Sequence, residues 1–141
     1  MAVHGGLLRL STPGDGAIVD LTDGVRTIVR RAEVEIGVAV VFAVGATVGV
    51  TTMEYEPGGV ADLQALLDRL VPRAPVAGDY EHNVRNHDTN AHAHLRAAVI
   101  GPSEWVPVVR GDLGLGTWQQ VVLIDFDDRP RDRVVSVQVL S

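Results

Sequence analysis

Apolar residues recur at helical spacing in three parts of the chain. The three segments are 22–32, 60–71 and 91–99. Each carries one apolar stripe flanked by polar positions, which is the pattern of a helix that packs one face on a core. Thr22 or Asp23 suits the cap of the first helix and Asn90 that of the third, because short side-chain oxygens accept free backbone N–H groups. The chain is therefore predicted to carry three helices.

The remaining apolar segments are rich in valine and predict strands, because β-branched side chains suit a pleated surface. They are 6–11, 17–21, 36–44, 46–53, 104–110, 119–126 and 133–140. The continuous apolar runs at 36–44 and 46–53 predict buried strands. We expect an α+β fold: one compact domain over residues 1–141, with a mainly antiparallel or mixed sheet and about three helices packed on it.

Composition narrows the class of protein further. With 141 residues, 46% of them hydrophobic, the chain is long enough to bury one core. Its net charge is −6 and it has no lysine, so we expect no nucleic-acid partner. The absence of cysteine excludes disulfides, thiolate catalysis and zinc–thiolate sites. No apolar run is long enough for a bilayer and no signal-peptide layout opens the chain, which predicts a cytoplasmic protein without membrane contacts.

Potential metal ligands and proton carriers gather in residues 80–96. This stretch contains His82, His87, His92 and His94, four of the five histidines. In a helix His92 and His94 diverge by about 200°, so only one of them points into a common site. We choose His94, and we expect a loop to bring His82 back towards it. Two imidazoles with a carboxylate, water or a third histidine would bind zinc or a similar divalent ion, and solvated loop histidines are the alternative.

Other polar residues stand near the ends of predicted strands. Glu54 follows a strongly apolar strand and is a candidate general base or ligand, or an ordinary strand-end charge. The glycine-rich segment 111–119 precedes a strand rather than a helix, so hairpin glycines explain it better than a phosphate loop. Thr117 and Gln119 can still present polar groups there. Arg131 and Arg133 are candidate clamps for phosphate or carboxylate, against the alternative of solvated arginines flanking a turn.

Taken together, several short motifs make the chain resemble the YjbQ family, which is also called secondary thiamine-phosphate synthase. They are Tyr80-Glu81-His82, Asn90 through Arg96, Gly101-Pro102-Ser103, Val106-Pro107-Val108, Gly111 through Gln119, Asp125-Phe126-Asp127, Arg131 and Arg133. The resemblance covers the chain from about Gly6 to Val139. So many ordered matches are specific, and on them the chain is identified as a member of the family.

The resemblance implies a compact α+β fold that assembles as a homotrimer, with polar pockets close to the subunit contacts. It implies site roles for Glu54, His82, His94, Thr117 and Gln119. Two positions depart from the family pattern: Gly45 stands where members have a histidine, and Met53 where they have an asparagine. If the family pocket holds a metal through three histidines, either His87 or His92 replaces the missing one, or metal binding and activity are altered.

Three functions follow as alternatives. The resemblance implies a transferase that joins a pyrimidine diphosphate to a thiazole phosphate, with His82, His94 or Glu54 handling protons. The second function is metal-assisted hydrolysis at the same site, with Glu54 as the base. The third is a non-catalytic trimeric protein that binds a small anionic metabolite or a metal. The chain has no aspartate-rich motif and no lysine to hold a diphosphate, which counts against the first function.

Overall fold

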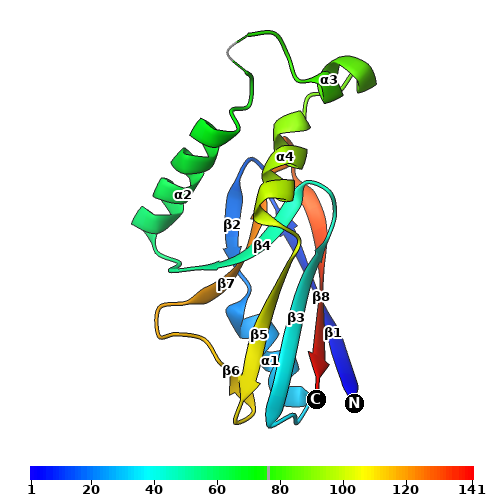
Figure 1. The fold of residues 1–141 in the computed structure, drawn as a ribbon, viewed down its shortest axis with the longest axis vertical. Coiled ribbons are helices and arrows are strands. Elements are labelled where there is room, and N and C mark those ends of the chain that lie inside the picture. Colours follow the sequence, from blue (N-terminus) through cyan, green and yellow to red (C-terminus); the bar gives the residue numbers. More distant parts are fainter. Residues whose placement is uncertain (76) are drawn as a thin grey trace.

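The computed structural model describes residues 1–75 and 77–141, which form four helices and eight strands (Figure 1). In chain order these are β1 (Val3–Thr12), β2 (Ala17–Asp20), α1 (Thr22–Arg31), β3 (Ile36–Val44), β4 (Val48–Met53), α2 (Pro57–Leu70), α3 (Glu81–Asn86), α4 (Ala91–Ile100), β5 (Ser103–Val109), β6 (Asp112–Leu113), β7 (Gln120–Asp125) and β8 (Arg131–Leu140). The predicted strands and helices are all present, with ends shifted by a few residues. Only α3 and β6 were not predicted.

The strands form two sheets in which every pair is antiparallel. One sheet has five strands in the order β1-β8-β3-β5-β6, and the other has three in the order β2-β7-β4. β8 is central to the larger sheet, where Val137 lies opposite Gly6 of β1 and Val41 of β3. The predicted α+β fold, with helices packed on a mainly antiparallel sheet, is therefore confirmed.

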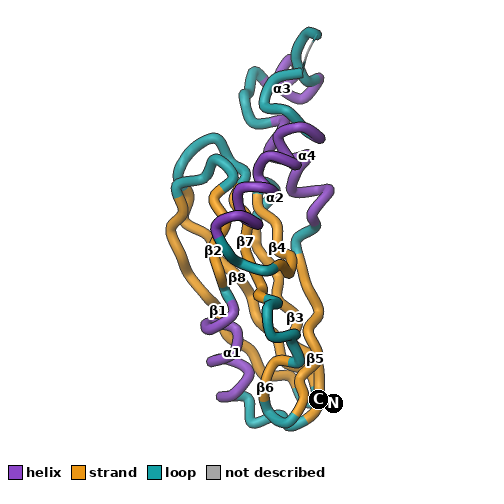
Figure 2. The backbone as a smooth tube through the Cα atoms, turned by 90° about the vertical axis from the view of Figure 1, so that its left-hand side faces the viewer, coloured by secondary structure: helices purple, strands orange, loops and turns teal. Residues whose placement is uncertain are grey.

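Two hydrophobic cores lie on opposite faces of the three-stranded sheet. Because successive side chains of a strand point to opposite faces, Val121 and Leu123 of β7 join the first core and Val122 and Ile124 the second. The first core fills the space between the two sheets and α1, and the second packs the smaller sheet against α2 and α4 (Figures 1 and 2). Burying each such side chain contributes about 1.5–3 kcal/mol. Because its two faces lie in different cores, β7 joins the layers.

The outer face of the five-stranded sheet is apolar and exposed. In β3, Ala39 and Val41 are fully buried, whereas Ile36 is 80% exposed and Phe42 is 43% exposed. The prediction of a buried strand at 36–44 is therefore wrong for alternate positions, because no layer of the described chain covers that side. We call the following residues the outer sheet face: Leu7, Ile36, Phe42, Val44, Trp105 and Val109.

The starts of α1 and α2 differ from the prediction. Neither Thr22 nor Asp23 caps α1, because the residue at the cap position is Leu21 and its side chain makes no such bond. Asp20 acts in their place: its Oδ1 accepts the backbone N–H of Thr22 at 2.9 Å. α2 begins at Pro57, three residues before the predicted start, since proline needs no N–H partner in the first turn.

The short helix α3 occupies part of a stretch that was predicted to be a loop, so His82 stands on a helix. α4 agrees with the prediction, but the side chain of Asn90 makes no cap hydrogen bond at its start. The Oδ1 atom of Asn83 instead accepts the N–H of Ala91 at 3.0 Å, which ties the start of α4 to α3. This bond helps to hold the two helices, and the histidines on them, close together.

The other end of α4 packs closely on β4. A Cβ atom added to Gly49 would lie 2.8 Å from Ile100 Cγ2 and 3.0 Å from the carbonyl oxygen of Gly101, so only glycine allows this approach. Val50 donates its backbone N–H to the same oxygen at 3.0 Å. α4 is thus fixed at both ends, which sets the directions of its histidines. None of the described helices has the length and hydropathy needed to cross a membrane.

Candidate functional site

His82 on α3 and His94 on α4 lie side by side. Their ring centroids are 4.7 Å apart, and the ring planes are tilted by 49°. Both line a concave surface of about 350 Å³, which we call the histidine pocket. Its lining consists of Tyr80, Glu81, His82, Ala91, His94 and Leu95. The structure therefore brings together the two histidines that were expected to converge, from two helices rather than from a loop and a helix.

One ring nitrogen of His82 has a partner and the other has none. Asn86 Nδ2 lies 3.3 Å from His82 Nδ1 and also donates to the His82 carbonyl oxygen at 3.0 Å. Because an amide NH₂ group only donates, Nδ1 is the acceptor and the neutral imidazole carries its proton on Nε2. Nε2 is buried without a hydrogen-bond partner in the described chain, and Asp88 Oδ2 is 3.9 Å away. An unpaired buried donor costs about 1–3 kcal/mol, which a bound acceptor would relieve.

His92 lines a different pocket from His94. This arginine pocket has a volume of about 340 Å³ and is lined by Asp15, Asp68, Pro72, Arg73, His92, Arg96 and Phe126. His92 is only 2% exposed, and its Nδ1 has no hydrogen-bond partner in the described chain. Burial lowers the pKa of His92, and the positive charges of Arg96 and Arg73 lower it further. His92 is therefore a neutral imidazole at neutral pH.

The histidine pocket supplies only part of a zinc site. The described residues contain no group of three or more His, Cys, Asp or Glu arranged to hold a metal ion. His87 ends α3 in a left-handed conformation, is exposed, and lines neither pocket, while His92 belongs to the arginine pocket. Two imidazoles remain, near the carboxylate of Asp88, whereas a catalytic zinc ion usually takes three protein ligands.

Glu54, Thr117 and Gln119 form a second group outside the histidine pocket. Glu54 is exposed just after the end of β4. Gln119 Nε2 donates to Thr52 Oγ1 of β4 at 3.2 Å, which keeps Gln119 near the same strand end. Thr117 and Gln119 line a third pocket, of about 310 Å³, together with Arg26 of α1. Within one chain, then, this group is separate from His82 and His94, and His87, His92 and Arg131 join neither of them.

The predicted clamp, Arg131 and Arg133, belongs to an ion-pair cluster that also contains Thr47, Asp125 and Asp127. The Arg133 side chain is 8% exposed and makes two hydrogen bonds to Asp125, from Nε to Oδ2 at 2.7 Å and from Nη2 to Oδ1 at 2.6 Å. Arg131 Nε donates to Asp127 Oδ2 at 2.8 Å. Burial raises the pKa of Asp127, but hydrogen bonds from Thr47 and Arg131 outweigh this and the pKa is lowered. Arg133 is paired through Nε and Nη2, whereas Arg131 is paired through Nε alone, so the clamp role of Arg131 stays a prediction.

Gly45 lies in the turn between β3 and β4, next to the ion-pair cluster. Its φ of 153° is uncommon for residues with a side chain. A Cβ atom at this position would lie 2.9 Å from Arg133 Nη1 and 3.0 Å from Val48 Cγ1. Met53, the second departure from the family pattern, packs against the second core. A histidine at position 45 would therefore require Arg133 to move.

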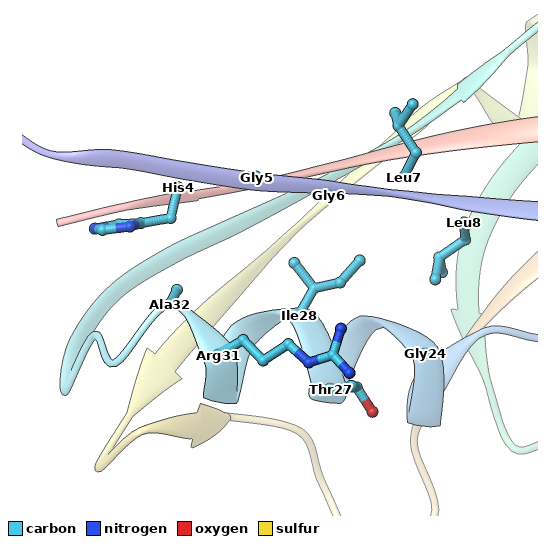
Figure 3. A pocket seen from close by; sticks show the side chains of 10 residues that line it. All are labelled: His4, Gly5, Gly6, Leu7, Leu8, Gly24, Thr27, Ile28, Arg31 and Ala32. Atoms are coloured by element: carbon cyan, nitrogen blue, oxygen red, sulfur yellow. The ribbon is translucent and has the colours of Figure 1, made fainter.

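A larger pocket, of about 560 Å³, lies between β1 and α1 (Figure 3). Figure 3 shows Ile28 rising from α1 towards β1 and Leu8 pointing down to the helix, while Leu7 points to the other side of the strand. The lining consists of His4, Gly5, Gly6, Leu7, Leu8, Gly24, Thr27, Ile28, Arg31 and Ala32. It includes none of the predicted site residues, and its ionisable side chains are His4 and Arg31 alone. The histidine pocket remains the better candidate.

Sequence and structure comparisons identify relatives of this chain. The family described as "UPF0047 protein YjbQ-like" matches residues 7–141. A UPF0047 protein of Archaeoglobus fulgidus is 36% identical over 133 residues, which cover 94% of this chain and 98% of the relative. A UPF0047 protein of Methanothermobacter thermautotrophicus is 33% identical over 139 residues, which cover 99% of this chain and 93% of the relative.

Comparison with solved structures supports the same family. An uncharacterised conserved protein of the YjbQ/UPF0047 family from Clostridium acetobutylicum has a TM-score of 0.84 at 36% identity, covering 95% of this chain and 98% of that one. A hypothetical protein from Aeropyrum pernix K1 has a TM-score of 0.88 at 31% identity, covering 97% of this chain and 98% of that one. The fold thus defines a class of small α+β proteins with two packed sheets. The chain belongs to the YjbQ-like UPF0047 family, as its motifs indicated.

Sequence reasoning missed the arginine pocket. Its charged residues come from separate parts of the chain: Asp15 precedes β2, Asp68 lies on α2, Arg73 follows α2 and Arg96 lies on α4. The one available signal was the spacing of His92 and Arg96, which share a helix face because they are four residues apart. The partners of His82 were easier to predict, because Asn86 and Asp88 lie in the same stretch, residues 80–96.

Proposed function

We propose that the histidine pocket is the active site of a transferase that acts on small phosphorylated metabolites. The observation that carries the proposal is the pair of imidazoles 4.7 Å apart, one of which has a buried Nε2 without a partner in the described chain. Imidazole is the side chain best suited to exchange protons near neutral pH. The family resemblance supports the substrates, a pyrimidine diphosphate and a thiazole phosphate, and thiamine phosphate as the product.

In this reaction the thiazole nitrogen forms a bond to the methylene carbon of the pyrimidine, and the bond from that carbon to the diphosphate oxygen breaks. The bonding electrons leave with pyrophosphate, whose growing charge must be stabilised. We assign the Nε2–H of His82, the unpaired donor, to hydrogen-bond the departing oxygen, and we assign His94 to supply a proton to it. Without a lysine or an aspartate-rich motif to hold the diphosphate, turnover is expected to be slow.

The test is an assay of thiamine phosphate formation by the purified protein, with and without added zinc. His82→Gln and His94→Gln are each expected to lower kcat by about 10²-fold or more, the usual contribution of a general acid or base. His87→Gln is the matched control, because His87 is exposed and lines neither pocket. Absence of product under every condition would overturn the proposal. Turnover of an ester, amide or phosphate would instead identify a hydrolase, and stabilisation by ligands without turnover a binding protein.

As an alternative to the proton role of His82, we propose that the histidine pocket binds a divalent ion, with zinc as the first choice; His82 would then need the tautomer whose Nε2 is unprotonated. The support is a donor set of two imidazoles beside Asp88, to which water or a neighbouring subunit must add the remaining ligands. The test is the metal content of untagged protein purified without chelator, beside a His82→Ala/His94→Ala double variant. About one zinc ion per chain, lost in the double variant, would support the site. Metal in neither protein after incubation with zinc would refute it.

The family resemblance also leads us to propose a homotrimer. The outer sheet face supports this, because exposed apolar side chains such as Trp105, which is 66% exposed, are expected to be covered by another surface. Assembly would also allow Glu54 and Gln119 of one subunit to complete the histidine pocket of the next. Sedimentation should give the mass of three chains, and Trp105→Asp should dissociate them. Leu70→Asp, on α2 and 61% exposed, should not. A monomeric wild-type protein would contradict the proposal.

A further inference from the structure

The arginine pocket is a second polar site that shares no lining residue with the histidine pocket. It forms where α4 meets the end of α2, the loop after α2 and the turn before β2. A smaller hollow, of about 170 Å³, shares Asp15, Asp68, Arg96 and Phe126 with it, so the two adjoin. Phe126 is 1% exposed and gives both an apolar wall. Volumes of this size are sufficient for a small metabolite.

Arg96 is held rigidly in the wall of this pocket. Its side chain is 8% exposed, and Nε and Nη2 donate to the carbonyl oxygen of Val71 at 2.9 Å and 2.7 Å. Nη2 also donates to Asp68 Oδ1 at 2.8 Å. These bonds satisfy a carbonyl at the end of α2 and orient the guanidinium plane. They use Nε and Nη2, and they leave the two N–H groups of Nη1 for a ligand.

Arg73 and His92 add two further groups. Arg73 Nη2 lies 2.7 Å from Asp15 Oδ1, and both side chains are more than half exposed, so this ion pair can open at little cost. His92 is buried, lines the pocket, and has no partner for Nδ1 in the described chain. It lies in the first turn of α4, where the helix dipole favours a negative charge.

We propose that the arginine pocket binds a small oxyanion, the phosphate or carboxylate group of a metabolite, between Arg73 and Arg96 and against His92. Planar guanidinium groups match the geometry of oxyanions and donate charge-assisted hydrogen bonds to them. Asp15 then acts as a competitor, because it must release Arg73 before the anion binds. This site does not depend on the reaction in the histidine pocket, so failure of the transferase assay leaves it unaffected.

The experiment is calorimetric titration of the full chain at low ionic strength, with inorganic phosphate in one arm and acetate in the other. We expect one phosphate or acetate site per chain, and the tighter of the two identifies the anion. Arg73→Gln should weaken binding by at least about tenfold, the loss expected for a charge-assisted hydrogen bond. Asp15→Asn should tighten binding, because it frees Arg73. Asn also suits the left-handed backbone of residue 15, whose φ is 59°.

Arg85→Gln is the matched control, because this arginine is 79% exposed on α3 and lines neither pocket. It should bind the anion as the wild-type protein does. Equal losses in Arg73→Gln and Arg85→Gln would mean non-specific attraction and would overturn the proposal. Weaker anion binding in Asp15→Asn would mean that Asp15 does not compete with the anion for Arg73 and would also overturn the proposed site. Titrations of wild-type protein that show no saturable binding of either anion would do the same.

Discussion

The buried ion-pair cluster and the histidine-rich stretch are both polar, but they differ in how their polar groups are satisfied. In the cluster, Asp125 accepts two hydrogen bonds from Arg133, and Thr47 accepts from Arg133 and donates to Asp127. In the stretch from residue 82 to residue 92, three buried side-chain atoms have no partner in the described chain. These atoms are His82 Nε2, Asn90 Oδ1 and His92 Nδ1.

This difference separates groups that stabilise the fold from groups that serve a ligand. Buried polar atoms in folded proteins are nearly always paired, because leaving one unpaired costs free energy. The cluster follows that rule, and its arginines hold β7 and β8 together. Two of the three unpaired atoms belong instead to residues that line pockets, His82 and His92, where a bound molecule would complete them; Asn90 lines neither pocket. Charge alone was therefore a poor guide to the site, and unsatisfied hydrogen bonding is a better one.

The largest effect is expected from breaking the ion-pair cluster. Arg133→Met leaves the fully buried carboxylate of Asp125 without its main partner, and such changes cost about 3–5 kcal/mol of unfolding free energy. Urea unfolding measures this loss, with Arg129→Met as the control because Arg129 is exposed. A loss no larger than that of the control would show that the cluster does not stabilise the fold.

Two neighbouring residues on α3 should respond in opposite ways. Asn83→Ala should lower the unfolding free energy by about 1–3 kcal/mol, because it leaves the N–H of Ala91 unpaired and also removes the bond to Asp79 Oδ1. His82→Phe should leave stability unchanged or raise it by up to about 1 kcal/mol, because it keeps a ring and removes an unpaired N–H. Equal losses in the two variants, measured by urea unfolding, would remove the distinction between paired and unpaired groups.

A smaller effect, dependent on pH, is expected at His92. Its folded pKa is lowered by burial and by Arg96 and Arg73, against the opposing effects of Asp128 and Asp15. Below about pH 6.5 the unfolded chain therefore binds more protons at this residue, and stability falls as the pH falls. His92→Asn should flatten the decline in Tm between about pH 7 and pH 5, whereas the exposed His87→Asn should not. Identical slopes in wild type and His92→Asn would contradict the assignment.

The smallest effect should come from the ion pair on the surface of α3. Arg85 Nε lies 3.0 Å from Glu81 Oε2, with side chains that are 79% and 82% exposed. Exposed pairs at this spacing contribute about 0.3–0.5 kcal/mol, so Glu81→Gln should change the unfolding free energy by no more than about 0.5 kcal/mol. Raising the salt concentration should remove even this difference. A change as large as that of Arg133→Met would contradict the comparison between buried and exposed pairs.

Most of the fold was predictable because its longer elements carry complete hydrophobic patterns. α3 and β6 were not predicted, because elements of six and two residues are too short to show a hydrophobic period. The exposure of Ile36 and Phe42 was not predicted, because the sequence of an apolar run is the same whether its second face packs on a core or lies on the surface. The separation of His92 from His94 followed from helix geometry alone. The charged lining of the arginine pocket did not, because distant segments meet there only in the folded chain.

The conformation at Gly45 has a consequence for any redesign of the turn between β3 and β4. A histidine introduced here by a single mutation would place its Cβ atom 2.9 Å from Nη1 of the guanidinium group that Asp125 holds in place. Adding a side chain at this position therefore requires Arg133 to be displaced or replaced as well. Substitutions at His82 and His94, which lie on α3 and α4, leave the ion-pair cluster intact.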